Sequence, residues 1–190
     1  MNRREALKRT ALLVGGAISL PTVSGVLSGC QPSSSNRWSP STLSAQQNEM
    51  VATIAQHIIP ETDTPGADAA HVNRFVDAIL TGSYLPPDRN RFLAGLDAVD
   101  PQAQEAHGSP FLDCTAEQQR SLLTEMDAAV FGPDAEFDPE NPPFFRMMKE
   151  LTLIGYYTSE VGATQELRTN IVPGYYDGCV PFDEIGRAWA

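Results

Sequence analysis

The sequence has few of the residues that build covalent scaffolds, and little positive charge. Three cysteines in 190 residues are too few for a disulfide-dense domain, and no Cys-x-x-Cys-His motif is present to attach a c-type haem. Only 13 Lys and Arg stand against 24 Asp and Glu, which gives a formal net charge of −11. Because nucleic-acid binding needs Lys or Arg to neutralise phosphates, no nucleic-acid partner is expected for this acidic chain.

The motifs of common cofactor and catalytic sites are also missing. The sequence contains neither Gly-x-Gly-x-x-Gly nor Gly-x-x-x-x-Gly-Lys-Ser/Thr, so nucleotide binding through these phosphate cradles is not expected. It has no His-x-x-x-His pair, and its two acidic loops depart from the calcium-binding EF-hand pattern. We therefore expect no catalytic residue, cofactor or metal ion in this chain.

The chain lacks an apolar run long enough to span a bilayer as a helix. The mildly apolar stretch Ala11–Leu20 has ten residues, whereas a membrane-spanning helix needs about 20. It follows a cationic start that contains the pair Arg3 and Arg4. Weak hydrophobicity behind paired arginines resembles a twin-arginine export signal, although Ala6 stands where such signals usually carry an aromatic residue. We therefore expect Arg3 and Arg4 to direct export to the periplasm.

The segment Leu27-Ser28-Gly29-Cys30 resembles a bacterial lipobox. The implied chemistry is lipidation of Cys30 with cleavage before it, and two or more acyl chains give stable membrane anchoring. Gln31 in place of Asp slightly favours the outer membrane over the inner one, by resemblance to sorting rules. The alternative is an ordinary signal peptide in which Cys30 is incidental. The expected organisation is a signal peptide over 1–29, a lipidated tether over 30–43 and a single helical domain over 44–190.

The remaining sequence has helical periodicity, and no alternating run of strand length stands out. Ser44 with Gln47, and Thr115 with Gln118, have the spacing of N-terminal capping boxes. The last long helix is apolar on most of its circumference, so it is either central or covered by a partner. We expect an all-α fold, an irregular bundle of about five helices with long loops and an extended, mostly irregular C-terminal segment. The expected helices cover 44–59, 71–80, 88–99, 116–130 and 144–159, with a short one near 183–189, while 100–110 is expected to be a loop with a helical turn.

Two cysteines are left if Cys30 is lipidated. In an oxidising compartment, Cys114 and Cys179 could form a disulfide that ties the C-terminal segment to the start of the fourth helix. The alternatives are two buried thiols, or one cysteine bridging to a partner. His57 lies near the apolar face of the first helix, where a histidine is more typical of packing or an interface than of catalysis.

Two runs rich in glycine and aromatic residues, 154–162 and 173–179, are candidates for a partner interface. Tyrosine buries a large area at low entropic cost and keeps a polar group, which suits interfaces. The alternative is that these rings close the bundle. The candidate interface residues are Tyr156, Tyr157, Ser159, Glu160, Tyr175, Tyr176 and Asp177.

An ordered set of segments resembles the small subunit, subunit 3 or gamma, of gluconate 2-dehydrogenase-type flavoprotein complexes. These segments are Ile54–Pro60, Thr62–Ala67, Phe145–Glu160, Gly162–Gln165, Val172–Tyr175, Tyr176–Cys179 and Gly186–Ala190. The resemblance implies a non-catalytic subunit. Its partners would be a large FAD-dependent subunit of the glucose-methanol-choline type, which oxidises a sugar or sugar acid, and a cytochrome c subunit that carries haem.

In such complexes the small subunit carries the twin-arginine signal and helps the large subunit to fold, to be exported and to remain stable. The resemblance leaves the substrate open, because specificity lies in the large subunit. Two other functions are retained as alternatives: a solitary envelope lipoprotein with a structural or ligand-binding role, and an independent enzyme.

Overall fold

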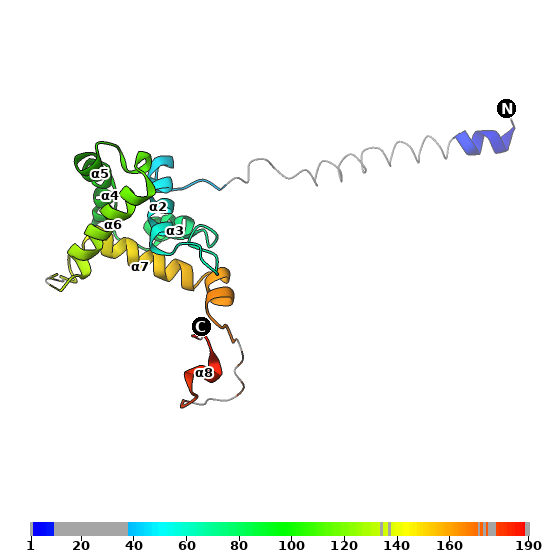
Figure 1. Ribbon diagram of the computed structural model, residues 1–190. Coiled ribbons are helices and arrows are strands. Elements are labelled where there is room, and N and C mark those ends of the chain that lie inside the picture. Colours follow the sequence, from blue (N-terminus) through cyan, green and yellow to red (C-terminus); the bar gives the residue numbers. More distant parts are fainter. Residues whose placement is uncertain are drawn as a thin grey trace. The chain divides into compact units, whose positions relative to one another are not determined.

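The structure is a computed structural model, and it describes residues 2–9, 38–133, 135–136, 138–170, 172, 174 and 178–188. The chain divides into two compact units, Met1–Ser39 and Pro40–Ala190 (Figure 1). In the first unit, residues 3–9 are helical, and Arg3 and Arg4 are exposed. Cys30 lies outside the described residues.

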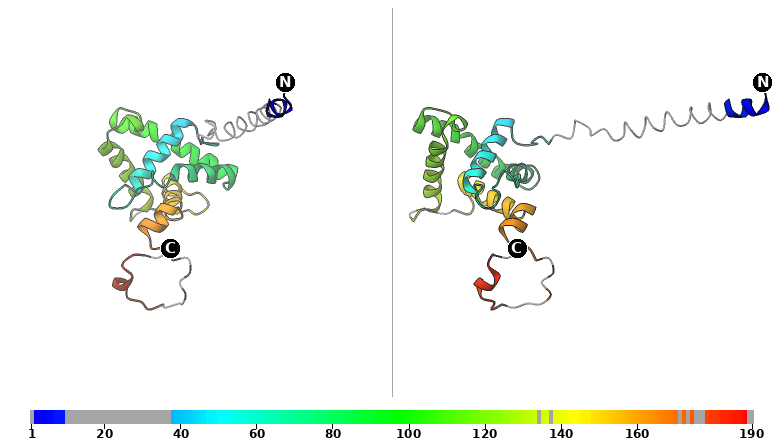
Figure 2. Two further views of the ribbon diagram at one scale, coloured as in Figure 1. Left: turned by 90° about the vertical axis from the view of Figure 1, so that its right-hand side faces the viewer. Right: turned by 45° about the vertical axis from the view of Figure 1, so that its right-hand side comes forward.

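The second unit is all-α over its described residues, which confirms the expected fold class (Figures 1 and 2). A 3-10 helix at Phe111–Asp113 and a π-helix at Gly162–Glu166 add to the α-helices. The α-helices are α2 (Ala45–Ile58), α3 (Val72–Gly82), α4 (Pro86–Asp97), α5 (Val99–His107), α6 (Ala116–Phe131), α7 (Phe144–Tyr157) and α8 (Phe182–Ile185).

Helix α5 is the main departure from the sequence-based expectation, which made 100–110 a loop. Pro101 falls in the first turn of this helix, where a backbone N–H has no intrahelical acceptor, so the proline interrupts nothing. Val99 and Ala103 are fully buried and give the helix its inward face. The bundle therefore has more helices than the five expected.

The N-terminal ends of α2 and α6 form the capping boxes that their sequences predict. The hydroxyl of Ser44 accepts from the backbone N–H of Gln47, whose side chain accepts in return from the N–H of Ser44. Thr115 and Gln118 repeat this arrangement at α6. Each box satisfies two backbone donors, one at the N-cap and one in the first turn.

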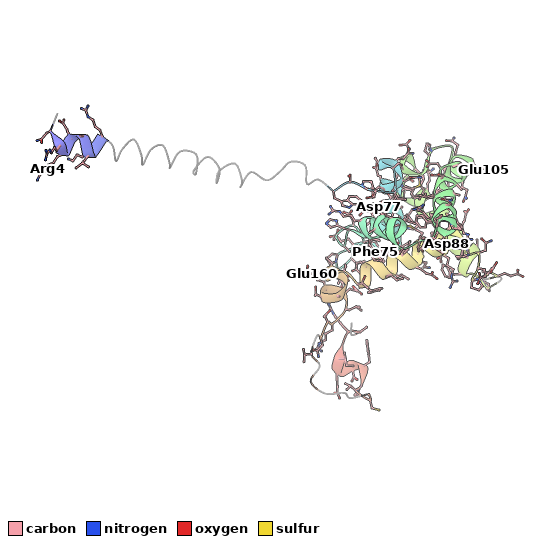
Figure 3. The ribbon with its side chains drawn as sticks, turned by 180° about the vertical axis from the view of Figure 1, so that it is seen from behind. Arg4, Phe75, Asp77, Asp88, Glu105 and Glu160 are labelled. Atoms are coloured by element: carbon pink, nitrogen blue, oxygen red, sulfur yellow. The ribbon has the colours of Figure 1, made fainter. Side chains whose placement is uncertain are left out.

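A buried carboxylate fixes the chain just before α2. Asp77 of α3, labelled in Figure 3, accepts backbone hydrogen bonds from Ser41 (2.8 Å), Thr42 (3.0 Å) and Leu43 (2.9 Å). Its side chain is 3% exposed, and Leu43 is also buried. These bonds place residues 41–43 within the bundle, so its ordered contacts begin slightly before the expected domain start at residue 44.

Helix α7 is the central element of the bundle and contacts α2, α3, α4 and α6. Two glycines allow its neighbours to approach closely. A Cβ at Gly95 of α4 would lie 2.1 Å from Cβ of Phe144, and a Cβ at Gly155 of α7 would lie 2.7 Å from Cδ1 of Phe75. Both distances are too short for a methyl group, so glycine is required at each crossing.

We predict that Gly95→Ala destabilises the protein by about 1–3 kcal/mol, because the added methyl overlaps Phe144 and forces the helices apart. Gly82→Ala is the matched control, since nothing lies within 4 Å of its added Cβ. We expect the control to be neutral or stabilising by up to about 1 kcal/mol. Denaturant unfolding of both variants measures the difference, and equal midpoints would contradict the close helix crossing.

Candidate functional site

The outward face of α7 changes character along its length. In the first half it is polar: Arg146 pairs with Glu150 at 2.9 Å, and Lys149 pairs with Asp127 of α6 at 2.5 Å. In the second half it is apolar. Leu153, Ile154 and Tyr157 are 37%, 52% and 39% exposed, and their spacing puts them on one side of the helix. We call these three residues the α7 patch.

The α7 patch lies opposite the face of α7 that forms the core. Residues on the inner face include Met148, Leu151, Thr152 and Gly155, all of them buried. The sequence allowed α7 to be either central or covered by a partner. In the structure it is central on one face, while the second half of its other face is apolar and exposed.

The structure corrects one candidate interface residue, Tyr156. This side chain is 1% exposed, and its hydroxyl donates a hydrogen bond to the carbonyl oxygen of Pro65 at 2.6 Å. Burial raises the pKa of Tyr156; a hydrogen bond with Thr64 opposes this shift, and the carboxylate of Glu166 adds to it. Tyr156 is therefore a core residue that holds the loop after α2.

The other candidate interface residues have different positions. Tyr157 and Glu160 are exposed, and Glu160 is labelled in Figure 3. Ser159 is engaged within the turn after α7, because its hydroxyl donates to the carbonyl of Tyr156 and accepts from the N–H of Gly162. The remaining candidates, Tyr175, Tyr176 and Asp177, lie outside the described residues.

Sequence reasoning did not name Leu153 or Ile154 among the candidate interface residues, although Ile154 begins the run 154–162. The signal that could have found them is Gly155, because a glycine inside a helix commonly marks a close contact with a neighbouring element. Residues two positions apart lie on nearly opposite sides of a helix. If Gly155 faces the core, Leu153 and Tyr157 therefore face away from it.

The loop between α2 and α3 joins the C-terminal half of α7. Besides the bond from Tyr156 to Pro65, the hydroxyl of Thr64 donates to Oε2 of Glu166 in the π-helix at 2.5 Å. The N–H of Ala67 donates to the carbonyl of Ile59 at 2.9 Å and closes the loop at its base. Two stretches that lie about 100 residues apart in the sequence therefore meet at the end of α7.

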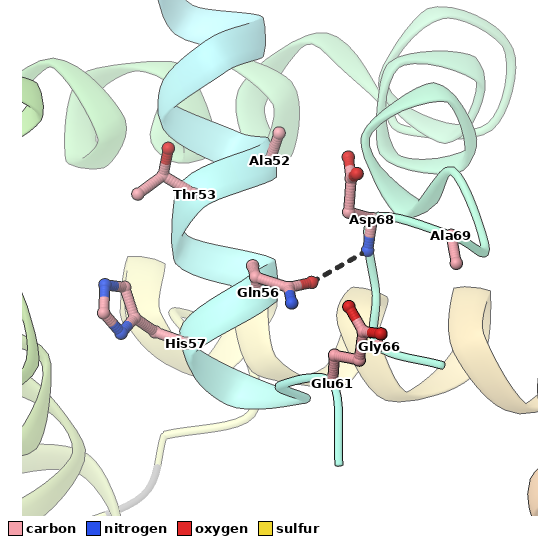
Figure 4. Close-up of a pocket in the computed structure, with 8 residues that line it drawn as sticks. All are labelled: Ala52, Thr53, Gln56, His57, Glu61, Gly66, Asp68 and Ala69. Carbon is pink, nitrogen blue, oxygen red and sulfur yellow. Dashed lines mark hydrogen bonds between the residues drawn. The ribbon is translucent and has the colours of Figure 1, made fainter. Parts of the chain in front are cut away.

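Two hollows flank His57. The larger, about 400 Å³, lies between α2 and the following loop (Figure 4), where Oε1 of Gln56 accepts from the N–H of Asp68 at 3.0 Å. Its rim carries the exposed residues Glu61 and Asp68. The smaller, about 220 Å³, is lined by residues of α2, α6 and α7, including Arg120 and Lys149.

His57 itself is part of a structural hydrogen-bond chain. Nε2 of His57 lies 2.9 Å from Oε1 of Gln119, whose amide nitrogen donates to the carbonyl of Phe111 at 2.9 Å. Because that amide oxygen can only accept, the network assigns the proton to Nε2 of His57. This half-buried histidine therefore makes a hydrogen bond between α2 and α6, and its position on the apolar face of α2 favours packing or an interface over catalysis.

The disulfide suggested by the sequence is not formed in the structure. Cys114 is buried, and its thiol donates to the carbonyl of Ser109 at 3.6 Å, while Cys179 is exposed in the C-terminal segment. That segment closes on itself through the N–H of Arg168, which donates to the carbonyl of Ala188 at 2.8 Å. A bridge would require Cys179 to reach the buried start of α6.

The described part of the chain contains no group of three or more His, Cys, Asp or Glu side chains that could hold a metal ion. Among the same residues, no helix is both long enough and apolar enough to cross a membrane.

The fold and this surface define a helical protein with exposed apolar residues on the second half of its central helix. Residues 45–174 match the family described as gluconate 2-dehydrogenase subunit 3. The chain belongs to this family, as its sequence segments suggested. No match was found among the curated proteins or among the solved structures.

We predict that Tyr156→Phe destabilises the protein by about 1 kcal/mol at neutral pH, because the carbonyl of Pro65 loses its donor. The raised pKa of Tyr156 means that the folded state holds this proton more tightly than the unfolded state. The stabilisation is therefore complete below the ordinary tyrosine pKa of about 10 and is lost as the pH rises through the higher folded value. Stability measured from pH 8 to 11 should fall less steeply for the Phe variant, and parallel curves would argue against this role.

Proposed function

We propose that this chain is the non-catalytic small subunit of a periplasmic, membrane-tethered FAD-dependent dehydrogenase complex that oxidises a sugar or sugar acid. The observation that carries this proposal is the α7 patch, an exposed apolar surface within the region that matches the family. Apolar and tyrosine side chains of this kind are typical of the centre of a protein interface. FAD would be bound by the large partner subunit, and haem by a cytochrome c subunit.

The N-terminal sequence supports a role in export. The twin-arginine route carries folded cargo, whereas this chain has no recognised cofactor motif of its own that would require folding in the cytoplasm. A flavoprotein partner must bind FAD before export, so it must fold in the cytoplasm, and this would explain the use of the twin-arginine route. The small subunit would then provide the signal, with Arg3 and Arg4, and help its partner to fold, cross the membrane and remain stable.

Lipidation of Cys30 would tether the exported complex. Residues 31–40 form a Ser- and Pro-rich linker whose ten residues span at most about 35 Å when extended. After removal of residues 1–29, nine cations remain against 23 anions, a net charge of −14. Such a chain is repelled by anionic lipid, so the lipid anchor rather than surface charge would hold it at the membrane.

The first test is purification of the tagged full chain from native membranes. We predict a yellow complex with a large flavoprotein, a flavin absorption spectrum and sugar-dependent dye reduction. The double variant Leu153→Ser/Ile154→Ser should retain at most about a tenth of the flavoprotein, because it removes apolar area from the α7 patch. Leu85→Ser is the matched control, since Leu85 is 68% exposed and lies outside the patch.

A colourless single band from the unmodified chain, purified under mild conditions, would contradict the proposal. It would instead favour the solitary lipoprotein. A flavoprotein retained equally by both serine variants would place the interface elsewhere on the bundle.

The second test concerns export of the partner. Replacing Arg3 and Arg4 by Lys should leave both this chain and the flavoprotein in the cytoplasm, because the signal would act on the assembled pair. Exchanging Lys8 for Arg and Arg9 for Lys keeps the same charge and leaves the pair intact, and it should not change export. Fractionation of periplasm and cytoplasm with flavin and activity assays gives the result, and normal export of the flavoprotein without the arginine pair would rule out the escort role.

A further inference from the structure

We propose that Arg120, at the rim of the smaller hollow, receives a carboxylate from the flavoprotein subunit beside the α7 patch. This inference rests on the proposed function and specifies the chemistry of the contact.

The hollow combines an apolar floor with a polar rim. Three helices meet there, and each supplies one apolar residue: Ile58 from α2, Leu123 from α6 and Phe145 from α7. Arg120, Thr124 and Lys149 are among the polar residues that surround them. The volume of about 220 Å³ is enough for one side chain of a partner, and too small for a drug-sized ligand, whose pockets begin at about 300 Å³.

The two cations at the rim differ in their surroundings. The ammonium of Lys149 is bound to Oδ1 of Asp127 at 2.5 Å and lies 4.5 Å from the ring centre of Phe131. Arg120 is exposed and makes no ion pair with any residue that the structure describes. Since Asp127 already compensates Lys149, the net positive charge of the hollow comes from the guanidinium of Arg120. A guanidinium binds a carboxylate through two parallel hydrogen bonds, which fixes the orientation of both groups.

The hollow adjoins the α7 patch along the helix. Lys149 lines the hollow and Leu153 begins the patch, and residues four apart on a helix are neighbours about 6 Å apart. An apolar centre with a charged group at its edge is the usual composition of a protein interface. A partner that covers the patch would therefore bring its own polar edge over Arg120.

Charge complementarity selects the occupant. The guanidinium of Arg120, in a chain with a net charge of −14 after signal removal, attracts a negative group. A second copy of this chain also carries carboxylates, but two such chains repel each other. The family match points to another occupant, the catalytic flavoprotein subunit, and we assign the carboxylate to it.

The test compares complexes formed by co-expressing the full chain with its flavoprotein. The dissociation constant is measured by dilution and mass photometry at about 50 mM and about 500 mM NaCl, where the Debye length falls from about 14 Å to about 4 Å. Arg120→Glu should weaken the complex by about tenfold or more at low salt, and much less at high salt. Arg89→Glu makes the same charge change on α4 and should leave the constant within about twofold of the unmodified value.

A second variant keeps Arg120 and fills the hollow. Thr124 is exposed at the rim, so Thr124→Trp should block the carboxylate and weaken the complex by a similar factor. The control is Glu105→Trp on α5, labelled in Figure 3, which places a tryptophan at another exposed position and should have little effect. Thermal unfolding of each variant establishes that the bundle is intact.

The outcomes separate the two proposals. Unchanged affinity of Arg120→Glu and Thr124→Trp at both salt concentrations overturns the carboxylate contact, while the proposed function stands if the Leu153 and Ile154 variant still weakens the complex. If the unmodified chain binds no flavoprotein, the proposed function itself fails, and this inference fails with it.

Discussion

The close packing of α7 against its neighbours is the constraint on which the rest of the bundle depends. Gly95 lets Phe144 of α7 reach the backbone of α4, and Gly155 lets Phe75 of α3 reach the backbone of α7. These two contacts fix which side of α7 faces inward at both of its ends. The opposite side must then face outward, whatever residues it carries. The apolar character of Leu153, Ile154 and Tyr157 is therefore not required by the fold, which is why it points to a partner.

Hydrogen bonds to loop backbone fix the two segments on either side of α2, which helix packing alone does not hold. Asp77 holds the segment that enters α2, and the hydroxyl of Tyr156 holds the loop that leaves it. Both groups are buried, and an unmade hydrogen bond in such a place costs about 1–3 kcal/mol. The two ends of α2 are thus fixed to α3 and α7, and the wall that α2 gives to each hollow is fixed with them.

The sequence predicted the helices best where a local chemical signal marks their start. Ser44 with Gln47 and Thr115 with Gln118 form the expected boxes, because their partners lie only three residues away. Helix α5 was missed, because residues 100–110 were expected to form a loop with a helical turn. A proline in the first turn, as Pro101 is, breaks no hydrogen bond and is compatible with the helix. The sequence could not separate Tyr156 from Tyr157, because the residues of α7 are apolar on most of its circumference. Only the contacts of Gly155 and Pro65, made by residues distant in sequence, bury one ring and leave the other exposed.

The exposed patch also links structure to the proposed order of assembly. Exposed apolar side chains that share one helix face, as in the α7 patch, favour self-association, so a subunit that carries them is best covered soon after it folds. Under the proposed function, the flavoprotein would cover the α7 patch in the cytoplasm, before export begins. An apolar contact alone fixes the relative orientation of two proteins only weakly. The cation of Arg120 beside the patch would therefore restrict which partners the unassembled subunit binds. A carboxylate positioned next to an apolar element would supply that orientation, and only a partner that carries both would match the surface.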